Sequence, residues 1–116
     1  MIINENVKYL VGSSKLNSEP LKPFDEKVLS FLDSFSRELS TFNNLINYPD
    51  LKSLSFWCRK NNFHNMKKNY GSLDNKLGVG LIFHITPSNI PTNFAYSLIF
   101  GLLSGNANLV KVPSKN

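Results

Sequence analysis

The fold of this chain is decided by residues 77–112, LGVGLIFHITPSNIPTNFAYSLIFGLLSGNANLVKV. The first part, residues 77–86, is a nearly continuous apolar run, which is typical of a strand in a parallel sheet with both faces buried. Residues 92–103 predict a helix, because Pro91 precedes them and the pair Gly105-Asn106 supplies a turn signal after them. The stretch therefore begins with a strand and a helix joined by a short loop.

A second strand is expected at residues 108–112, where Pro113 stops it. Strand, helix and strand in this order form a βαβ unit, whose strands should be parallel and whose crossover should be right-handed. Two strands and one helix cannot cover both faces of such a sheet. We therefore expect an incomplete domain with exposed apolar surface, and a native polypeptide that continues beyond Asn116.

Two helices are predicted upstream of this unit. Phe24-Asp25-Glu26-Lys27 opens the first helix and Pro49 ends it. Its apolar residues recur every three or four positions and form one stripe: Val28, Leu32, Phe35, Leu39, Phe42 and Ile46. The second helix is expected from Asp50, its N-cap, to Lys68, with an interruption at Asn61-Asn62 left open. The fold class is therefore α/β, with a helical region over residues 1–72 followed by an α/β domain that starts over residues 73–116.

Charge is distributed unevenly along the chain. Residues 1–57 carry six Lys or Arg against seven Asp or Glu, whereas residues 58–116 carry seven against one. A basic half favours an anionic partner, such as a phosphate-bearing cofactor, a nucleic acid or a membrane surface, and a merely solvated face is an equally good interpretation. The start of the chain lacks the pattern of a signal peptide, and the apolar stretch at residues 94–103 is too short to span a bilayer. We therefore expect a cytoplasmic protein without a membrane span.

Cys58 is the only cysteine, so a disulfide within the chain and a metal site built on several thiolates are excluded. It lies on a predicted helix, and we expect a buried structural thiol there in preference to a reactive one. His84 lies inside the apolar strand and is expected to be a hydrogen-bonded core histidine. No metal site is predicted.

Two polar residues follow the predicted strands at their carboxyl ends, where open α/β sheets bind ligands. Prolines flank Asn89 and limit its freedom, so its amide could donate to an oxygen that gains charge during acyl transfer. A plain role in turn geometry is the competing interpretation of Asn89. Lys111, near the end of the second strand, could meet a cofactor phosphate or ribose, or it could simply reach solvent.

Several separate blocks of this sequence carry a resemblance. They are Gly78-Val79-Gly80, TPSNIP at residues 86–91, LSGN at residues 103–106 and VKVPS at residues 110–114. In order and spacing they resemble the aldehyde dehydrogenase superfamily. With Phe56-Trp57-Cys58-Arg59-Lys60, they are most similar to its acyl-CoA reductases, typified by the fatty-acid reductase of bacterial luminescence. The resemblance implies an aldehyde-dehydrogenase-like, Rossmann-type parallel sheet.

The resemblance also implies roles for individual residues. Asn89 matches the asparagine that holds the oxyanion, and Lys111 matches the lysine that contacts the adenosine ribose or its 2′-phosphate. Residues Thr86, Pro87 and Ser88 match the loop that lines the cofactor, although Ser88 replaces the family's tryptophan. Ser114 or Lys115 stands where the family has a ribose-binding glutamate. Because a lysine attracts a 2′-phosphate and a carboxylate repels it, the implied cofactor is NADPH.

The activity that the resemblance implies is NADPH-dependent reduction of fatty acyl-CoA to an aldehyde through a cysteine thioester. The family's nucleophilic cysteine lies beyond Asn116, so the chain alone is expected to be inactive. The expected partners are an acyl-CoA or acyl-protein substrate, an acyl-transferring enzyme and further copies in a homo-oligomer, with no nucleic acid. Three alternatives stay open: an NAD(P)-dependent aldehyde dehydrogenase working oxidatively, a basic nucleic-acid-binding module and a helical interaction module.

Overall fold

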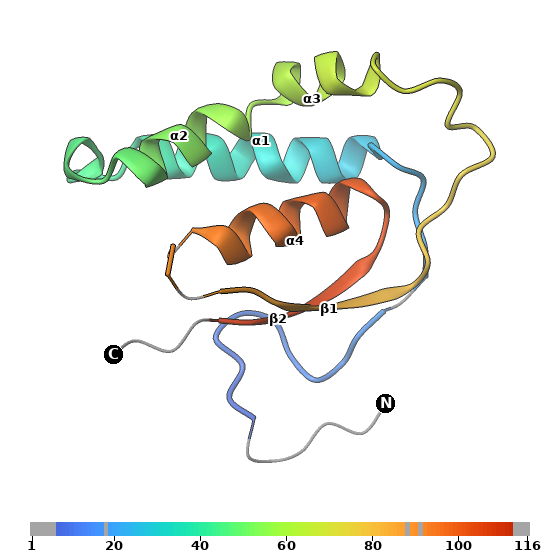
Figure 1. The fold of residues 1–116 in the computed structure, drawn as a ribbon, viewed down its shortest axis with the longest axis horizontal. Coiled ribbons are helices and arrows are strands. Elements are labelled where there is room, and N and C mark those ends of the chain that lie inside the picture. Colours follow the sequence, from blue (N-terminus) through green and yellow to red (C-terminus); the bar gives the residue numbers. More distant parts are fainter. Residues whose placement is uncertain (1–6, 18, 88, 91, 113–116) are drawn as a thin grey trace.

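The computed structural model describes residues 7–17, 19–87, 89–90 and 92–112. Helices come first along the chain, and a strand–helix–strand unit follows them (Figure 1). The elements are α1 (Glu26–Ser40), the short 3-10 helix η1 (Leu45–Asn47), α2 (Pro49–Trp57), α3 (Lys60–Lys67), β1 (Leu81–Ile85), α4 (Asn93–Leu103) and β2 (Ala107–Lys111).

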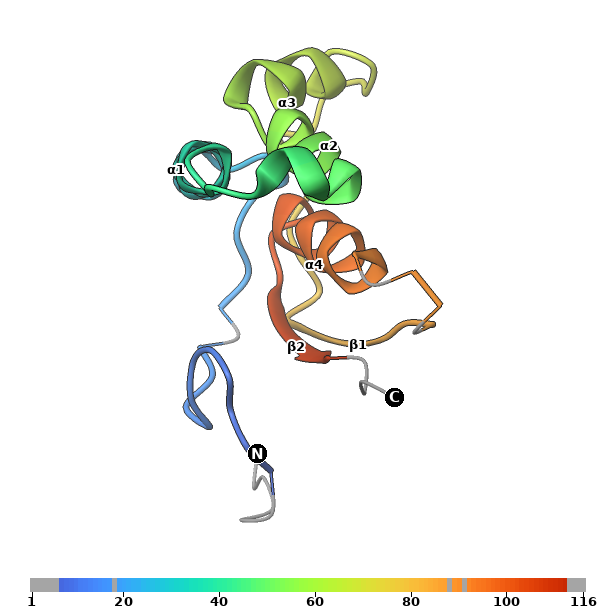
Figure 2. The same ribbon diagram turned by 90° about the vertical axis from the view of Figure 1, so that its left-hand side faces the viewer.

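The two strands pair in parallel, with Leu81 opposite Ala107 and Ile85 opposite Lys111. This confirms the predicted strand–helix–strand order and the parallel pairing. α4 packs on one face of the sheet, and residues 7–17 pass on the opposite side (Figures 1 and 2). Because the strands are parallel and in register, both end at the same edge of the sheet.

The prediction that β1 is buried on both faces is wrong. Its side chains alternate, since His84 is 7% exposed whereas Phe83 and Ile85 are 54% and 69% exposed. α4 covers the face that carries His84, and the two apolar side chains lie on the other face. The expected exposed apolar surface is therefore present, and it includes Phe100 on α4, which is 51% exposed.

The first predicted helix is confirmed, but it ends at Ser40 and does not run to Pro49. The hydroxyls of Ser40 and Thr41 donate to backbone carbonyl oxygens three residues earlier, at 2.6 and 2.7 Å. Such local bonds compete with the helical pattern and favour a helix end. The predicted stripe positions Phe42 and Ile46 consequently lie beyond α1 and are 49% and 81% exposed.

The N-cap of α2 lies two residues earlier than the predicted Asp50. Its N-cap is Tyr48, and Asp50 lies in its first turn. Pro49 is well placed at the first helical position, because its missing N–H would have no intrahelical partner there. The carboxylate of Asp50 then lies where the helix dipole favours negative charge.

The second predicted helix is in fact two helices, because the backbone of Arg59 is extended. The break therefore comes before Asn61-Asn62. The backbone N–H of Lys60 donates to Oδ1 of Asp33 on α1 at 3.0 Å, so a carboxylate from another helix stabilises the start of α3. The side chain of Asn62 donates to the carbonyl of Phe56 at 2.9 Å and satisfies the end of α2.

One hydrophobic core joins the first three helices to α4. Its most deeply buried side chains come from both parts of the chain: Leu29, Leu32, Leu54, Cys58, Phe63, Ile99 and Leu103. Burial of each large apolar side chain contributes about 1.5–3 kcal/mol. Residues on both sides of position 72 thus share a core, and the domain boundary placed there stays a prediction.

The backbone of Leu21 ties the start of the chain to the βαβ unit. Its N–H donates to the carbonyl of Gly105 at 2.9 Å, and its own carbonyl accepts from the N–H of Gly78 at 3.0 Å. We call these two bonds the Leu21 clasp. A Cβ on Gly105 would overlap the Leu21 carbonyl, and the φ of Gly105 is 87°, so the clasp requires glycine there.

Candidate functional site at the carboxyl edge of the sheet

The carboxyl ends of β1 and β2 bring two of the predicted site residues to one edge. Ile85 is paired with Lys111, and the chain leaves β1 through Thr86 and Pro87 towards Asn89. Asn89 lies in a bend and is exposed, and Lys111 is exposed at the last position of β2. Because both side chains are exposed at this edge, each is accessible to a ligand that binds there.

The loop after β1 is fixed where it enters α4. The carbonyl of Ile90 accepts a hydrogen bond from the N–H of Asn93 at 3.1 Å, and the carbonyl of Thr92 accepts one from Ala95 at 3.0 Å. Thr92 is 8% exposed. Asn89 therefore lies between the end of a strand and a buried helix cap.

Thr86 carries a buried hydroxyl oxygen, Oγ1, that has no hydrogen-bond partner among the described residues. Buried polar atoms in native proteins nearly always have a partner, so such an atom points to a group outside these residues. Thr86 directly follows the Ile85–Lys111 pair. Its hydroxyl oxygen therefore lies at the carboxyl edge, where protein atoms cover it.

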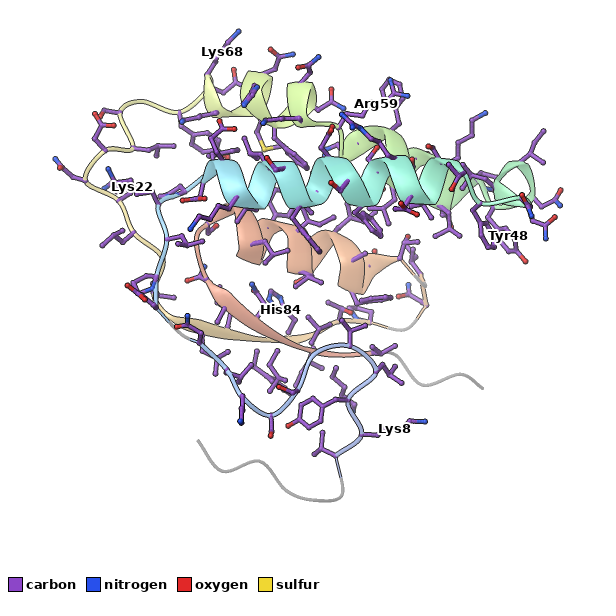
Figure 3. The ribbon with its side chains drawn as sticks, turned by 180° about the vertical axis from the view of Figure 1, so that it is seen from behind. Lys8, Lys22, Tyr48, Arg59, Lys68 and His84 are labelled. Atoms are coloured by element: carbon purple, nitrogen blue, oxygen red, sulfur yellow. The ribbon has the colours of Figure 1, made fainter. Side chains whose placement is uncertain are left out.

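A buried polar cluster lies between α4 and the sheet, directly behind this edge. Nδ1 of His84 lies 2.8 Å from Oγ of Ser97 on α4, and Nε2 lies 2.7 Å from Oδ1 of Asn108 on β2. Figure 3 shows His84 between the helix and the strands. A neutral imidazole with its proton on Nε2 satisfies both contacts, because it donates to the amide oxygen and accepts from the hydroxyl. The expected hydrogen-bonded core histidine is confirmed.

Asn106 extends the cluster to the start of β1. Its Oδ1 accepts from the N–H groups of Val79 and Gly80 at 2.6 and 3.3 Å, and the Asn108 side chain donates to the Asn106 carbonyl at 2.8 Å. A Cβ on Gly101 would fall below 3.0 Å from both His84 and Asn108. The cluster therefore fixes β1, β2 and α4 relative to one another, and with them the loop that carries Asn89.

Sequence reasoning placed His84 correctly but missed Ser97 and Asn108. Two signals were available: polar residues within otherwise apolar segments, and the glycine at position 101 inside a helix, where it costs about 1 kcal/mol relative to alanine. Three predicted site residues, Ser88, Ser114 and Lys115, lie outside the described residues.

Cys58 is a buried thiol, as predicted. Its side chain is 0% exposed, and burial raises its pKa to about 11. A thiol that stays protonated and inaccessible is a poor nucleophile. Cys58 therefore belongs to the helical core and takes no part in the chemistry of the carboxyl edge.

In the part of the chain that the structure describes, no helix combines the length and the apolar character that a membrane span needs.

Comparison with known proteins identifies the family. Searches among curated proteins and solved structures gave no match. The family model of acyl-CoA reductase (LuxC) matches residues 37–116, which include α2, α3 and the whole βαβ unit. This match covers well over half of the sequence, and the chain therefore belongs to the LuxC acyl-CoA reductase family.

Proposed function

We propose that this chain contributes the first part of the cofactor and oxyanion site of an NADPH-dependent reductase. The reductase converts fatty acyl-CoA to fatty aldehyde. The observation that carries the proposal is the placement of Asn89 and Lys111 at one sheet edge: Lys111 ends β2 opposite Ile85, and Asn89 lies in the loop that follows Ile85. The family match supports the acyl-CoA substrate.

The residues at this edge fit a phosphorylated dinucleotide. Lys111 offers an exposed ammonium, which attracts a phosphate, and Thr86 follows its strand partner Ile85 at the same edge. Residues 58–116 carry seven basic side chains against one acidic side chain, which favours anionic ligands in general. When bound, the cofactor supplies the hydride.

The reaction proceeds through a cysteine that we place downstream of residue 116. Its thiolate attacks the thioester carbonyl, a new carbon–sulfur bond forms, and the CoA thiolate leaves. Hydride addition to the enzyme-bound thioester then gives a tetrahedral thiohemiacetal oxyanion, and loss of the cysteine thiolate yields the aldehyde. The amide of Asn89 donates a hydrogen bond to the oxygen that becomes negative in both steps.

The test is steady-state kinetics of the polypeptide that carries residues 1–116 together with the downstream cysteine. Asn89→Ala should lower turnover on the order of 100- to 1000-fold with little change in KM for acyl-CoA, because the amide meets full charge only in the transition state. Lys111→Ala should raise KM for NADPH more than KM for NADH. Asn75→Ala and Lys76→Ala, exposed in the loop before β1, are matched controls.

Two results would contradict this proposal. A parent enzyme that reduces no acyl-CoA with either nicotinamide cofactor would refute the activity. Turnover of Asn89→Ala within about twofold of the parent would leave the asparagine with a role in loop geometry only, since loss of an oxyanion donor costs far more than that.

A further inference from the structure

A groove of about 850 Å³ lies between α2, α3 and the first turn of α4, apart from the carboxyl edge. We call it the α2–α4 groove and define it by Lys52, Phe56, Trp57, Asn65, Asn69 and Tyr96, which are among its lining residues. Its walls combine aromatic rings, carboxamides and a cation. The rings of Trp57 and Tyr96 also pack against the hydrophobic core, whereas the site described above uses none of these groups.

The aromatic wall is built around Trp57. The ring of Trp57 lies 5.0 Å from that of Tyr96 and 5.4 Å from that of Phe63, so it is held by packing. Phe56, next to it, is 60% exposed. A firmly held indole beside an exposed phenyl ring provides a stacking surface for a flat ring such as a nucleobase.

The opposite wall carries carboxamides. Asn65 lies on α3, which ends at Lys67, and Asn69 lies in the turn that follows; both line the groove. Both residues are exposed. A carboxamide donates and accepts hydrogen bonds at once, and this pattern matches the edge of a purine base.

The charge on this side of the molecule is positive. Lys52 lines the groove, and the guanidinium of Arg59 lies 4.5 Å above the ring of Phe56. Burial of the phenol raises the pKa of Tyr96, and the nearby charge of Asp50 raises it further. Asp50 lies in the first turn of α2, at the opposite end of that helix from Arg59, so the Arg59 end is open to a phosphate.

The groove also leads towards the loop that carries Asn89. Tyr96 lies one turn inside α4, which starts at Asn93, and Asn93 is hydrogen-bonded to Ile90 next to Asn89. From these features we infer that the α2–α4 groove binds the 3′-phosphoadenosine diphosphate end of acyl-CoA, with the pantetheine arm running along α4 towards Asn89. This assignment rests on the proposed function, because that function supplies the CoA thioester.

The chain itself provides the probe, since Trp57 is its only tryptophan and lines the groove. Titration of the 116-residue chain with adenosine 3′,5′-bisphosphate should quench the tryptophan fluorescence saturably. Phe56→Ala should weaken binding by about tenfold, because stacking of a base on an aromatic ring is worth about 1–3 kcal/mol. Lys52→Gln and Arg59→Gln should each weaken binding by several-fold through loss of a phosphate contact.

Two substitutions outside the groove serve as matched controls. Phe31→Ala removes a similarly exposed ring from α1, and Lys27→Gln removes an exposed lysine from the same helix, so both should bind like the parent. Circular dichroism checks that each variant is folded. Adenosine 2′,5′-bisphosphate, which carries the phosphate pattern of NADPH, should bind at least about tenfold more weakly.

The inference is overturned by any of three results: no saturable quenching, equal losses in the control variants, or tighter binding of the 2′,5′-isomer. These results are independent of the kinetic test of function. A chain that binds the 3′,5′-isomer in the groove while the longer polypeptide reduces no acyl-CoA would retain the binding site and refute the activity. If the longer polypeptide reduces acyl-CoA but the chain does not bind the 3′,5′-isomer in the groove, the activity is retained and the binding site is refuted.

Discussion

Gly101 offers a test in which two physical effects oppose each other. It lies in the interior of α4, where helix propensity alone predicts that Gly101→Ala stabilises the protein by about 1 kcal/mol. The structure predicts the opposite sign. The new Cβ would fall below 3.0 Å from Oδ1 of Asn108 and would lie 2.9 Å from Nε2 of His84. Something in the buried polar cluster must therefore move.

The cost of that movement can be estimated. Overpacking of a close-packed interior costs about 1–3 kcal/mol. Displacement of the Asn108 amide also leaves the buried Nε2 of His84 without its acceptor at 2.7 Å, which adds about 1–3 kcal/mol. After the gain in helix propensity is subtracted, Gly101→Ala should lower the free energy of unfolding by roughly 3 kcal/mol.

Urea unfolding followed by circular dichroism measures this change. Gly71→Ala is the matched control, because a Cβ there meets no atom within 4 Å, and it should be neutral or slightly stabilising. Asn108→Ala removes the main clash, so Gly101→Ala should cost much less in that background than in the parent. A Gly101→Ala variant as stable as the parent, or more stable, would show that the cluster is too soft to fix the strands and helix.

Three further predictions concern the helices. Burial raises the pKa of the Cys58 thiol to about 11. The thiol should therefore react with a disulfide reagent more than about tenfold slower in the native chain than in concentrated urea. Equal reaction rates would contradict the burial. A backbone N–H of α3, and secondarily the charge of Arg37, lowers the pKa of Asp33 from 3.8. The ionised Asp33 carboxylate therefore stabilises the folded state fully above pH 3.8, and this contribution is lost as the pH falls through the lowered pKa. Asp33→Asn should therefore be less stable than the parent at neutral pH, and the difference in unfolding free energy should shrink in acid; a difference that does not change with pH would refute this. Ser36 and Ser55 each donate to the other's backbone carbonyl across α1 and α2, so Ser36→Ala should cost about 1–3 kcal/mol in urea unfolding, whereas a neutral effect would mean that water replaces the hydroxyl.

The local sequence was sufficient to predict the βαβ unit and the start of α1. A continuous apolar run between Gly78 and Pro87 permits few alternatives to a strand, and the later run before Pro113 has the same character. Parallel pairing then follows from the intervening helix, because a short turn cannot join parallel strands. The edge that carries Asn89 and Lys111 is a direct consequence of this topology, although their chemical roles stay predictions.

The incorrect sequence-based predictions concern places where distant residues determine the local structure. The break between α2 and α3 depends on the carboxylate of Asp33, which lies on another helix and caps α3 across the core. The exposed face of β1 depends on how many helices cover the sheet, and the spacing within a strand does not report that. The cluster of His84, Ser97 and Asn108 joins three elements, so no single stretch of sequence displays it.

The Leu21 clasp has a consequence for the order in which the chain folds. It joins Leu21 to Gly105 in the turn between α4 and β2, so residues 21–105, well over half of the chain, lie in the loop that it closes. Closing so long a loop is entropically costly until α4 and the strands have already formed. We therefore expect the clasp to be absent from the folding transition state. Substitutions at Gly105 should then accelerate unfolding while leaving the rate of folding nearly unchanged.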